Sequence, residues 1–111
     1  MSMTFDEYQK LSKGTAQYSD FIPAWIYLAL GLAGESGEVV DKLKKVARNH
    51  DGNFTEESKL EIQKELGDVL WYISQLCEEL GLSLGEVAEM NRAKLEDRKA
   101  RGVIRSRGDN R

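Results

Sequence analysis

Apolar and polar residues follow a helical period along most of the chain, and start and stop signals divide that pattern into four segments. A threonine or serine followed three residues later by glutamate is a capping box, and Thr4 and Ser83 each begin one. Pro23 suits the first turn of a helix because it has no amide hydrogen to lose, and Thr55 can cap a helix that stops near Gly81. The pattern therefore predicts four helices, over about residues 4–14, 23–48, 55–81 and 83–102.

The two long middle helices are joined by the turn-forming segment NHDGN, residues 49–53. A short connection favours antiparallel neighbours, so we expect an all-α four-helix bundle with two long antiparallel helices at its centre. The length of 111 residues suits one domain covering residues 1–111. Residues 102–111 have no apolar period, and we expect them to form either a flexible basic tail or a segment that folds over substrate with Arg105, Arg107 and Arg111.

At 100° per residue, an apolar arc can be assigned to each long helix as its inward face. On the first long helix the arc consists of Trp25, Ala29, Leu32, Val39, Val40, Leu43 and Ala47. On the second it consists of Ile62, Leu66, Val69, Ile73, Leu76, Cys77 and Leu80. Three glycines recur in the first helix, Gly31, Gly34 and Gly37. We expect them to keep one side of that helix thin enough for close approach of another helix or a ligand.

Acidic side chains border both predicted inward faces. Glu35 lies at the edge of the first arc, close to Leu28 and Val46, and Glu38 lies one turn further on. On the second long helix one stripe follows the border: Glu61, Glu65, Asp68 and Tyr72. Antiparallel packing can bring these borders together, and two carboxylates 4 Å apart repel by about 4 kcal/mol at an effective dielectric near 20. Protonation, basic partners or divalent cations would relieve that repulsion.

The donor atoms in this acidic set are all oxygens, with no histidine and no second cysteine beside them. Such a set disfavours zinc and suits Mg²⁺ or Mn²⁺. Mg²⁺ usually keeps several waters and binds substrate phosphates, so an incomplete protein cage implies a phosphorylated ligand. The alternative is a solvated acidic face of the kind that many helices carry.

Composition narrows the function classes. A net charge of −3, with 41% hydrophobic and 32% charged residues, is typical of a globular protein and gives no reason to expect nucleic acid as a partner. The single cysteine, Cys77, excludes an intrachain disulfide and suits a reducing cytoplasm. The uncharged run FIPAWIYLALGLAG, residues 21–34, is shorter than the roughly 20 residues of a membrane span, so we interpret it as a buried helix segment and expect no membrane partner.

The stretches GLAGESGEVVDKLKK and KELGDVLWYI resemble the MazG-like family of all-α nucleoside triphosphate pyrophosphohydrolases. That family carries E-E-x-x-E on one helix and E-x-x-D on the next. Glu35 and Glu38 fill the last two acidic positions of the first motif, and Glu65 and Asp68 fill the second. Gly34 stands where the family has its first glutamate.

Two later segments also resemble this family. NRAKLEDRKARG, residues 91–102, places Asn91, Lys94 and Arg98 on one helical face. Family members often carry a similar N-x-x-K that contacts the nucleotide phosphates. GVIRSRGDNR, residues 102–111, resembles the ending of a compact, phage-type branch of the family.

The resemblance implies a Mg²⁺-dependent enzyme, with Mn²⁺ as a possible substitute, that hydrolyses (d)NTP to (d)NMP and pyrophosphate in nucleotide-pool control. It implies a homodimer or homotetramer. The expected metal ligands are Glu35, Glu38, Glu65 and Asp68, with Glu38, helped by Glu35, as the catalytic base. The expected substrate contacts are Asn91, Lys94, Arg98 and Trp71.

Some alternatives stay open on the sequence alone. Trp71 lies nearly opposite the predicted inward face of its helix, so it either stacks on a base or packs at a subunit contact. Asp41 or Glu61 would be the replacement for the acid absent at Gly34, and that absence leaves the number of bound ions open. Rival functions are a phosphoribosyl-ATP pyrophosphohydrolase-like enzyme and a catalytically silent, nucleotide-binding helical oligomer. The preferred base and sugar, the physiological role and the phosphorus attacked are not fixed by these residues.

Overall fold

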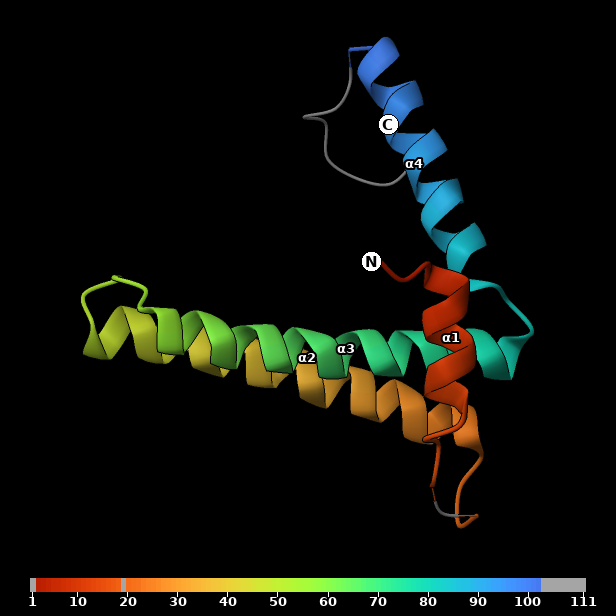
Figure 1. Ribbon diagram of the computed structural model, residues 1–111, viewed down its shortest axis with the longest axis horizontal. Coiled ribbons are helices and arrows are strands. Elements are labelled where there is room, and N and C mark those ends of the chain that lie inside the picture. The colour runs from red at the N-terminus through yellow and green to blue at the C-terminus, as the bar shows by residue number, and fades with distance from the viewer. Residues whose placement is uncertain (1, 19, 103–111) are drawn as a thin grey trace.

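The computed structural model describes residues 2–18 and 20–102, and this part of the chain is entirely helical apart from its connections (Figure 1). The helices are α1 (Phe5–Lys13), α2 (Ala24–Asn49), α3 (Glu56–Leu80) and α4 (Leu84–Ala100). The all-α, four-helix prediction is confirmed, and each predicted bound is within three residues of the observed one. The expectations for the basic tail, with Arg105, Arg107 and Arg111, lie outside the described residues.

The helix ends follow the side-chain chemistry that the sequence indicated. The Thr4 hydroxyl accepts from the Glu7 amide at 3.0 Å, and the Glu7 carboxylate accepts from the Thr4 amide at 2.8 Å, which completes the predicted capping box. Gly81 ends α3 in the left-handed conformation, with φ of 69°. Pro23 directly precedes α2 rather than lying in its first turn. These local signals explain why the bounds were predictable.

The cap of α4 differs in one respect from the predicted box. The Ser83 hydroxyl accepts from the Glu86 amide at 3.1 Å, as expected. The same hydroxyl donates to Asp6 of α1 at 2.9 Å, and the Gly85 amide donates to Asp6 at 3.1 Å. The start of α4 is therefore tied to α1 by a carboxylate that is distant in sequence.

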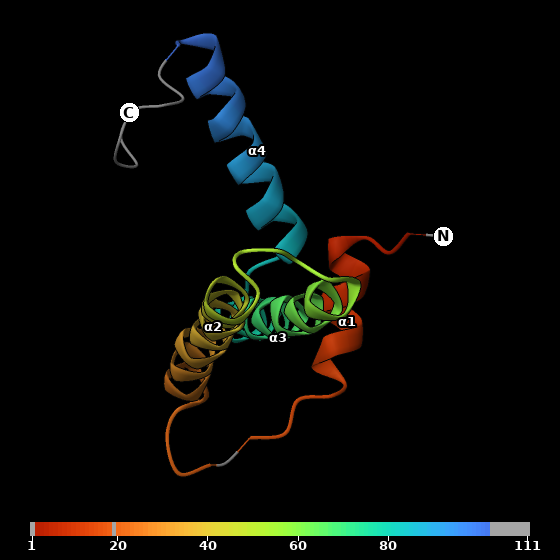
Figure 2. The same cartoon turned by 90° about the vertical axis from the view of Figure 1, so that its left-hand side faces the viewer.

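The two long helices, α2 and α3, run antiparallel and side by side for most of their length (Figures 1 and 2). With 26 and 25 residues, each is about 38 Å long at 1.5 Å per residue. The predicted central pair is confirmed. Within the described part of the chain, none of the helices has an apolar stretch long enough to cross a bilayer.

The face that α2 turns inward differs from the predicted arc. Leu28 and Val46 are the buried residues of α2, and Glu35 lies on the same side of the helix between them. Much of the predicted arc faces outward instead: Trp25, Val40 and Leu43 are 56%, 63% and 41% exposed. The arc contains the most apolar residues of α2, but α3 covers only one side of that helix. Since α1 packs on α3 rather than on α2, no second helix of the described chain covers the rest of the arc.

Helix α1 crosses α3 and covers the side of α3 that carries Trp71 (Figure 1). The Trp71 indole N–H donates to the Thr15 hydroxyl at 2.8 Å. The chain's own N-terminal segment thus contacts Trp71 and covers it in part, while a subunit contact or base stacking at this residue stays a prediction. Ser74 and Gln75, which follow on the same side of α3, are buried.

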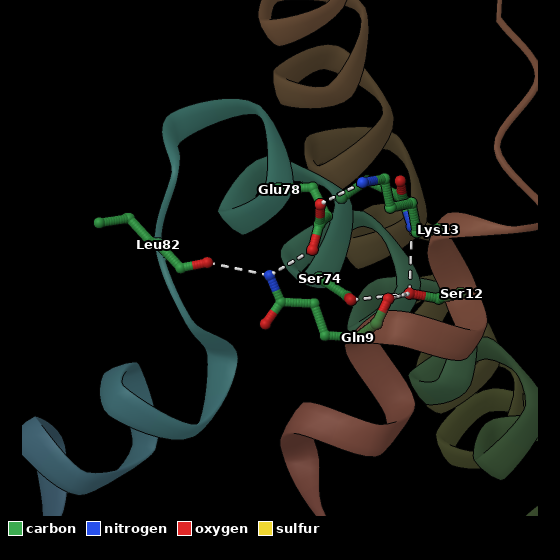
Figure 3. Close-up of polar contacts among 7 residues, drawn as sticks. Gln9, Ser12, Lys13, Ser74, Glu78 and Leu82 are labelled. Atoms are coloured by element: carbon green, nitrogen blue, oxygen red, sulfur yellow. Dashed lines mark hydrogen bonds and ion pairs between the residues drawn. The ribbon is translucent and has the colours of Figure 1, made fainter.

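A polar joint connects α1, the end of α3 and the start of α4 (Figure 3). The Gln9 side-chain amide donates to Glu78 at 2.8 Å and to the Leu82 carbonyl at 2.9 Å. The Ser12 and Ser74 hydroxyls lie 2.8 Å apart and share a hydrogen bond. From this joint α4 leads away from the α2–α3 pair, as two views of the chain show (Figures 1 and 2).

Candidate metal centre

Three carboxylates meet between the long helices. Glu35 reaches them from α2, and Glu65 and Asp68 reach them from α3, where they lie three residues apart on one face. One oxygen from each of the three groups lies within 4.8 Å of the other two. In the part of the chain that the structure describes, no other group of three acidic, histidine or cysteine side chains is placed to hold a metal ion.

The electrostatics of Glu35 reflect this crowding. Burial raises the pKa of its carboxyl group, and the charges of Asp68 and Glu65 raise it further. A hydrogen bond with Glu65 and the charge of Glu38 act in the same direction on this pKa. Every charged group that shifts Glu35 is thus an acid, so the cluster carries a local excess of negative charge.

The cluster fits a hard divalent cation. Its donors are all carboxylate oxygens, which are the ligands of Mg²⁺ and Mn²⁺ rather than of zinc. Three side chains leave coordination positions for water or for phosphate oxygens. The chemistry of the donor set therefore agrees with the metal that the sequence suggested.

Glu38 lies next to the group without belonging to it. Its charge acts on Glu35 and on Lys42, but its carboxylate is not among the three that converge. The structure thus brings together three of the four expected ligands, and Glu38 borders them.

The two acids considered as replacements at Gly34 are held by lysines. Lys42 of α2 donates to Glu61 of α3 at 2.9 Å, and the charged ammonium lowers the pKa of that carboxyl group. Asp41 forms ion pairs with Lys45 at 2.9 Å and Lys44 at 3.4 Å. Neither Asp41 nor Glu61 belongs to the converging group.

The expected phosphate contacts lie elsewhere in the chain. Asn91 and Lys94 are exposed on α4, and Arg98 is buried on the same helix. Because α4 packs on α1 and α3 at the polar joint and then leads away, one copy of the described chain does not bring these residues beside the carboxylates (Figure 2). Trp71 is on the side of α3 that faces α1, and its ring contacts Tyr72 edge-on at 5.0 Å.

Two residues beside the cluster were missed as site residues in the sequence. They are Tyr27 and Tyr72: burial is the main cause that raises the pKa of Tyr72, and the neighbouring Tyr27 raises it further. Gly31, one turn after Tyr27, lies under the Tyr72 ring. The signal was present in the spacing, since residues 27, 31, 35 and 38 form a stripe on α2 that can face the acidic stripe of α3.

Comparison with known proteins agrees with this architecture. Residues 26–103, which include all of α2 but its first two residues, α3, α4 and the three carboxylates, match the MazG nucleotide pyrophosphohydrolase domain. The chain is also 44% identical over 114 residues to the "Gene 37 protein" of Mycobacterium phage L5, covering 98% of this chain and 100% of that protein. No solved structure gives a significant match. The chain belongs to the MazG nucleotide pyrophosphohydrolase family.

Proposed function

We propose that this protein is a Mg²⁺-dependent nucleoside triphosphate pyrophosphohydrolase, which adds water to a (d)NTP and releases (d)NMP and pyrophosphate. The observation that supports it best is the convergence of Glu35, Glu65 and Asp68 within 4.8 Å, in a chain of this family. The fit of that group to a hard cation links the site to a polyphosphate substrate.

Glu35, Glu65 and Asp68 would hold the ion, with Glu38 as an additional ligand or neighbour. When bound, Mg²⁺ or Mn²⁺ supplies positive charge that offsets the polyphosphate, polarises the attacked phosphorus and lowers the pKa of water. Without a bound cation the carboxylates would repel a polyphosphate. They would therefore hold the substrate phosphates near the long helices only when the cation is bound.

Glu38 is our candidate for the base that accepts a proton from the attacking water. It borders the converging group, and its oxygens are not among those crowded within it. Burial and its acidic neighbours raise the pKa of Glu35 in the metal-free chain, and the positive charge of a bound cation would offset that repulsion, so Glu35 would assist Glu38 as an ionised ligand of the ion.

Asn91, Lys94 and Arg98 remain the proposed contacts to the substrate phosphates. Since α4 leads away from the cluster within one copy, we propose a homodimer or homotetramer in which subunits pack through the exposed arc of α2. The proposed setting is nucleotide-pool control in the cytoplasm.

The test of this proposal is pyrophosphate release from a panel of canonical, deoxy and oxidised nucleoside triphosphates, with phosphoribosyl-ATP assayed in parallel. We expect turnover of at least one nucleoside triphosphate with Mg²⁺ or Mn²⁺, and none in EDTA. Selective turnover of phosphoribosyl-ATP would assign the rival enzyme. Metal-dependent nucleotide binding with no product would assign the silent oligomer.

A further inference from the structure

At Gly31 a side chain of α3 lies directly against the backbone of α2. A Cβ atom built on Gly31 would lie 2.1 Å from Cε1, 2.5 Å from Cζ and 2.7 Å from Cδ1 of Tyr72. Contacts that short do not occur in folded proteins, so no side chain fits at position 31 while the ring stays in place. The Tyr72 ring therefore rests directly on the helix backbone.

The other two glycines of this segment are different. A Cβ atom built on Gly34 or on Gly37 meets nothing within 4 Å. The expected close approach of another helix is thus confirmed for Gly31, while no described part of the chain approaches Gly34 or Gly37, where approach by a ligand stays a prediction. The helix has one glycine that its packing requires and two that face open space in the chain.

The Tyr72 ring is held in its position by aromatic and polar neighbours. Tyr27 lies beside it, and the ring of Trp71 packs against it edge-on, with ring centroids 5.0 Å apart. Tyr27 is stacked on Tyr18, with centroids 5.4 Å apart. Stacked and edge-on pairs of this kind restrict ring orientation, so a clash at Gly31 would be relieved by moving α2 away from α3 as well as by turning the ring.

The contact is one helical turn from the carboxylate cluster on both helices. Gly31 precedes Glu35 by four residues on α2, and Tyr72 follows Asp68 by four residues on α3. In an antiparallel pair, the Gly31–Tyr72 contact and the Glu35–Asp68 approach are therefore neighbouring contacts along the same interface. The distance between the helices at the first contact sets the distance between the carboxylates at the second.

We propose that Tyr72 is a positioning residue for the metal centre and that its ring is held in place by packing on the backbone at Gly31. The ring acts as a spacer: it holds α2 and α3 at the separation where Glu35 meets Asp68 and Glu65. This inference rests on the proposed function only in taking the three carboxylates as a metal site. It assigns Tyr72 and Gly31 a role that does not depend on which nucleotide is cleaved.

The test compares Gly31→Ala with Gly37→Ala, two substitutions on one helix that bring the same gain in helix propensity. The measurement is Mn²⁺ affinity without nucleotide, by electron paramagnetic resonance or calorimetry, after circular dichroism has shown equal helicity. We expect Gly37→Ala to bind Mn²⁺ like the unmodified protein and Gly31→Ala to bind it about 10–100-fold more weakly, as for loss of a group that orients metal ligands. Equal affinity in the two variants would overturn the proposal.

Two substitutions of Tyr72 distinguish the role of the ring from that of its hydroxyl group. They also test the proposal if Gly31→Ala does not fold. The spacer account predicts that Tyr72→Phe keeps Mn²⁺ affinity within about threefold and that Tyr72→Ala loses about 10-fold or more. Unchanged affinity in Tyr72→Ala would overturn the proposal, and so would an unmodified protein that binds no Mn²⁺. An unmodified protein that binds Mn²⁺ but cleaves no nucleotide would contradict the proposed function alone.

Discussion

Glu35 is a carboxylate on the side of α2 that packs against α3, between the buried residues Leu28 and Val46. An ionised group in this position loses hydration and is repelled by Asp68 and Glu65. The metal-free fold therefore carries an electrostatic cost at this residue, and a bound cation would remove it. This cost can be measured as a pH dependence of the free energy of unfolding.

The pKa of Glu35 is raised in the folded protein, so between its unfolded and folded values the folded chain binds more protons than the unfolded chain. Stability contributed by this group is then lost as the pH rises through that window. We predict that Glu35→Gln, measured by thermal unfolding in EDTA, is more stable than the unmodified protein at pH 7, by about 0.5 kcal/mol for relief of like-charge contacts. The advantage should shrink toward pH 4, where the unmodified carboxyl is protonated.

Glu61→Gln is the matched control for this measurement. Glu61 lies on α3, one helical turn before Glu65. Lys42 lowers the pKa of Glu61, so its contribution is present above its unfolded pKa and is lost as the pH falls. Glu61→Gln should therefore be less stable than the unmodified protein at pH 7, opposite in sign to Glu35→Gln. The interpretation of Glu35 would be wrong if both substitutions changed stability in the same direction at that pH.

At the scale of the helices, sequence and structure agree where the chemistry is local. Thr4 with Glu7, Thr55 before α3 and Gly81 after it set helix ends through hydrogen bonds within a few residues, and these were predictable. The inward face of α2 could not be predicted in this way, because it depends on which other helices pack against α2 and not on the sequence of α2 alone. In the folded chain α2 turns the face with Gly31, Leu28 and Val46 toward α3, and much of its most apolar arc stays exposed.

The exposed arc of α2 leads to a prediction about association. If subunits pack through it, Leu43→Glu should weaken self-association at least about 100-fold, since burying a leucine contributes roughly 1.5–3 kcal/mol and a buried charge costs more. Light scattering after size exclusion would show an oligomer for the unmodified protein at micromolar concentration and a monomer for this variant. Helicity should be unchanged, because Leu43 is 41% exposed in the single chain.

Leu60→Glu provides the comparison. Leu60 is 52% exposed on α3 and lies outside the α2 arc, so the same change there should leave the oligomer intact. Dissociation by Leu60→Glu but not by Leu43→Glu would move the interface to another surface. A monomeric unmodified protein at about 100 µM would contradict the oligomer proposal.

At the scale of the whole molecule, contacts that follow from helix spacing and antiparallel pairing could be predicted, whereas the position of α4 relative to the long helices could not. The i, i+3 spacing of Glu65 and Asp68 and the antiparallel pairing predicted the meeting with Glu35. The position of α4 depends on Gln9 and Asp6, which bind the ends of α3 and α4 from about 70 residues away along the chain. No local pattern around Asn91 or Lys94 indicates that arrangement.

The central claim is that the converging carboxylates bind the metal on which hydrolysis depends. Its most direct test is Mg²⁺-dependent pyrophosphate release by Asp68→Asn, with Asp41→Asn as the control because Asp41 is paired with Lys44 and Lys45 outside the group. We predict that Asp68→Asn retains its helicity and loses about 100-fold or more in turnover, whereas Asp41→Asn stays within about threefold of the unmodified protein. Undiminished turnover in folded Asp68→Asn would contradict the account.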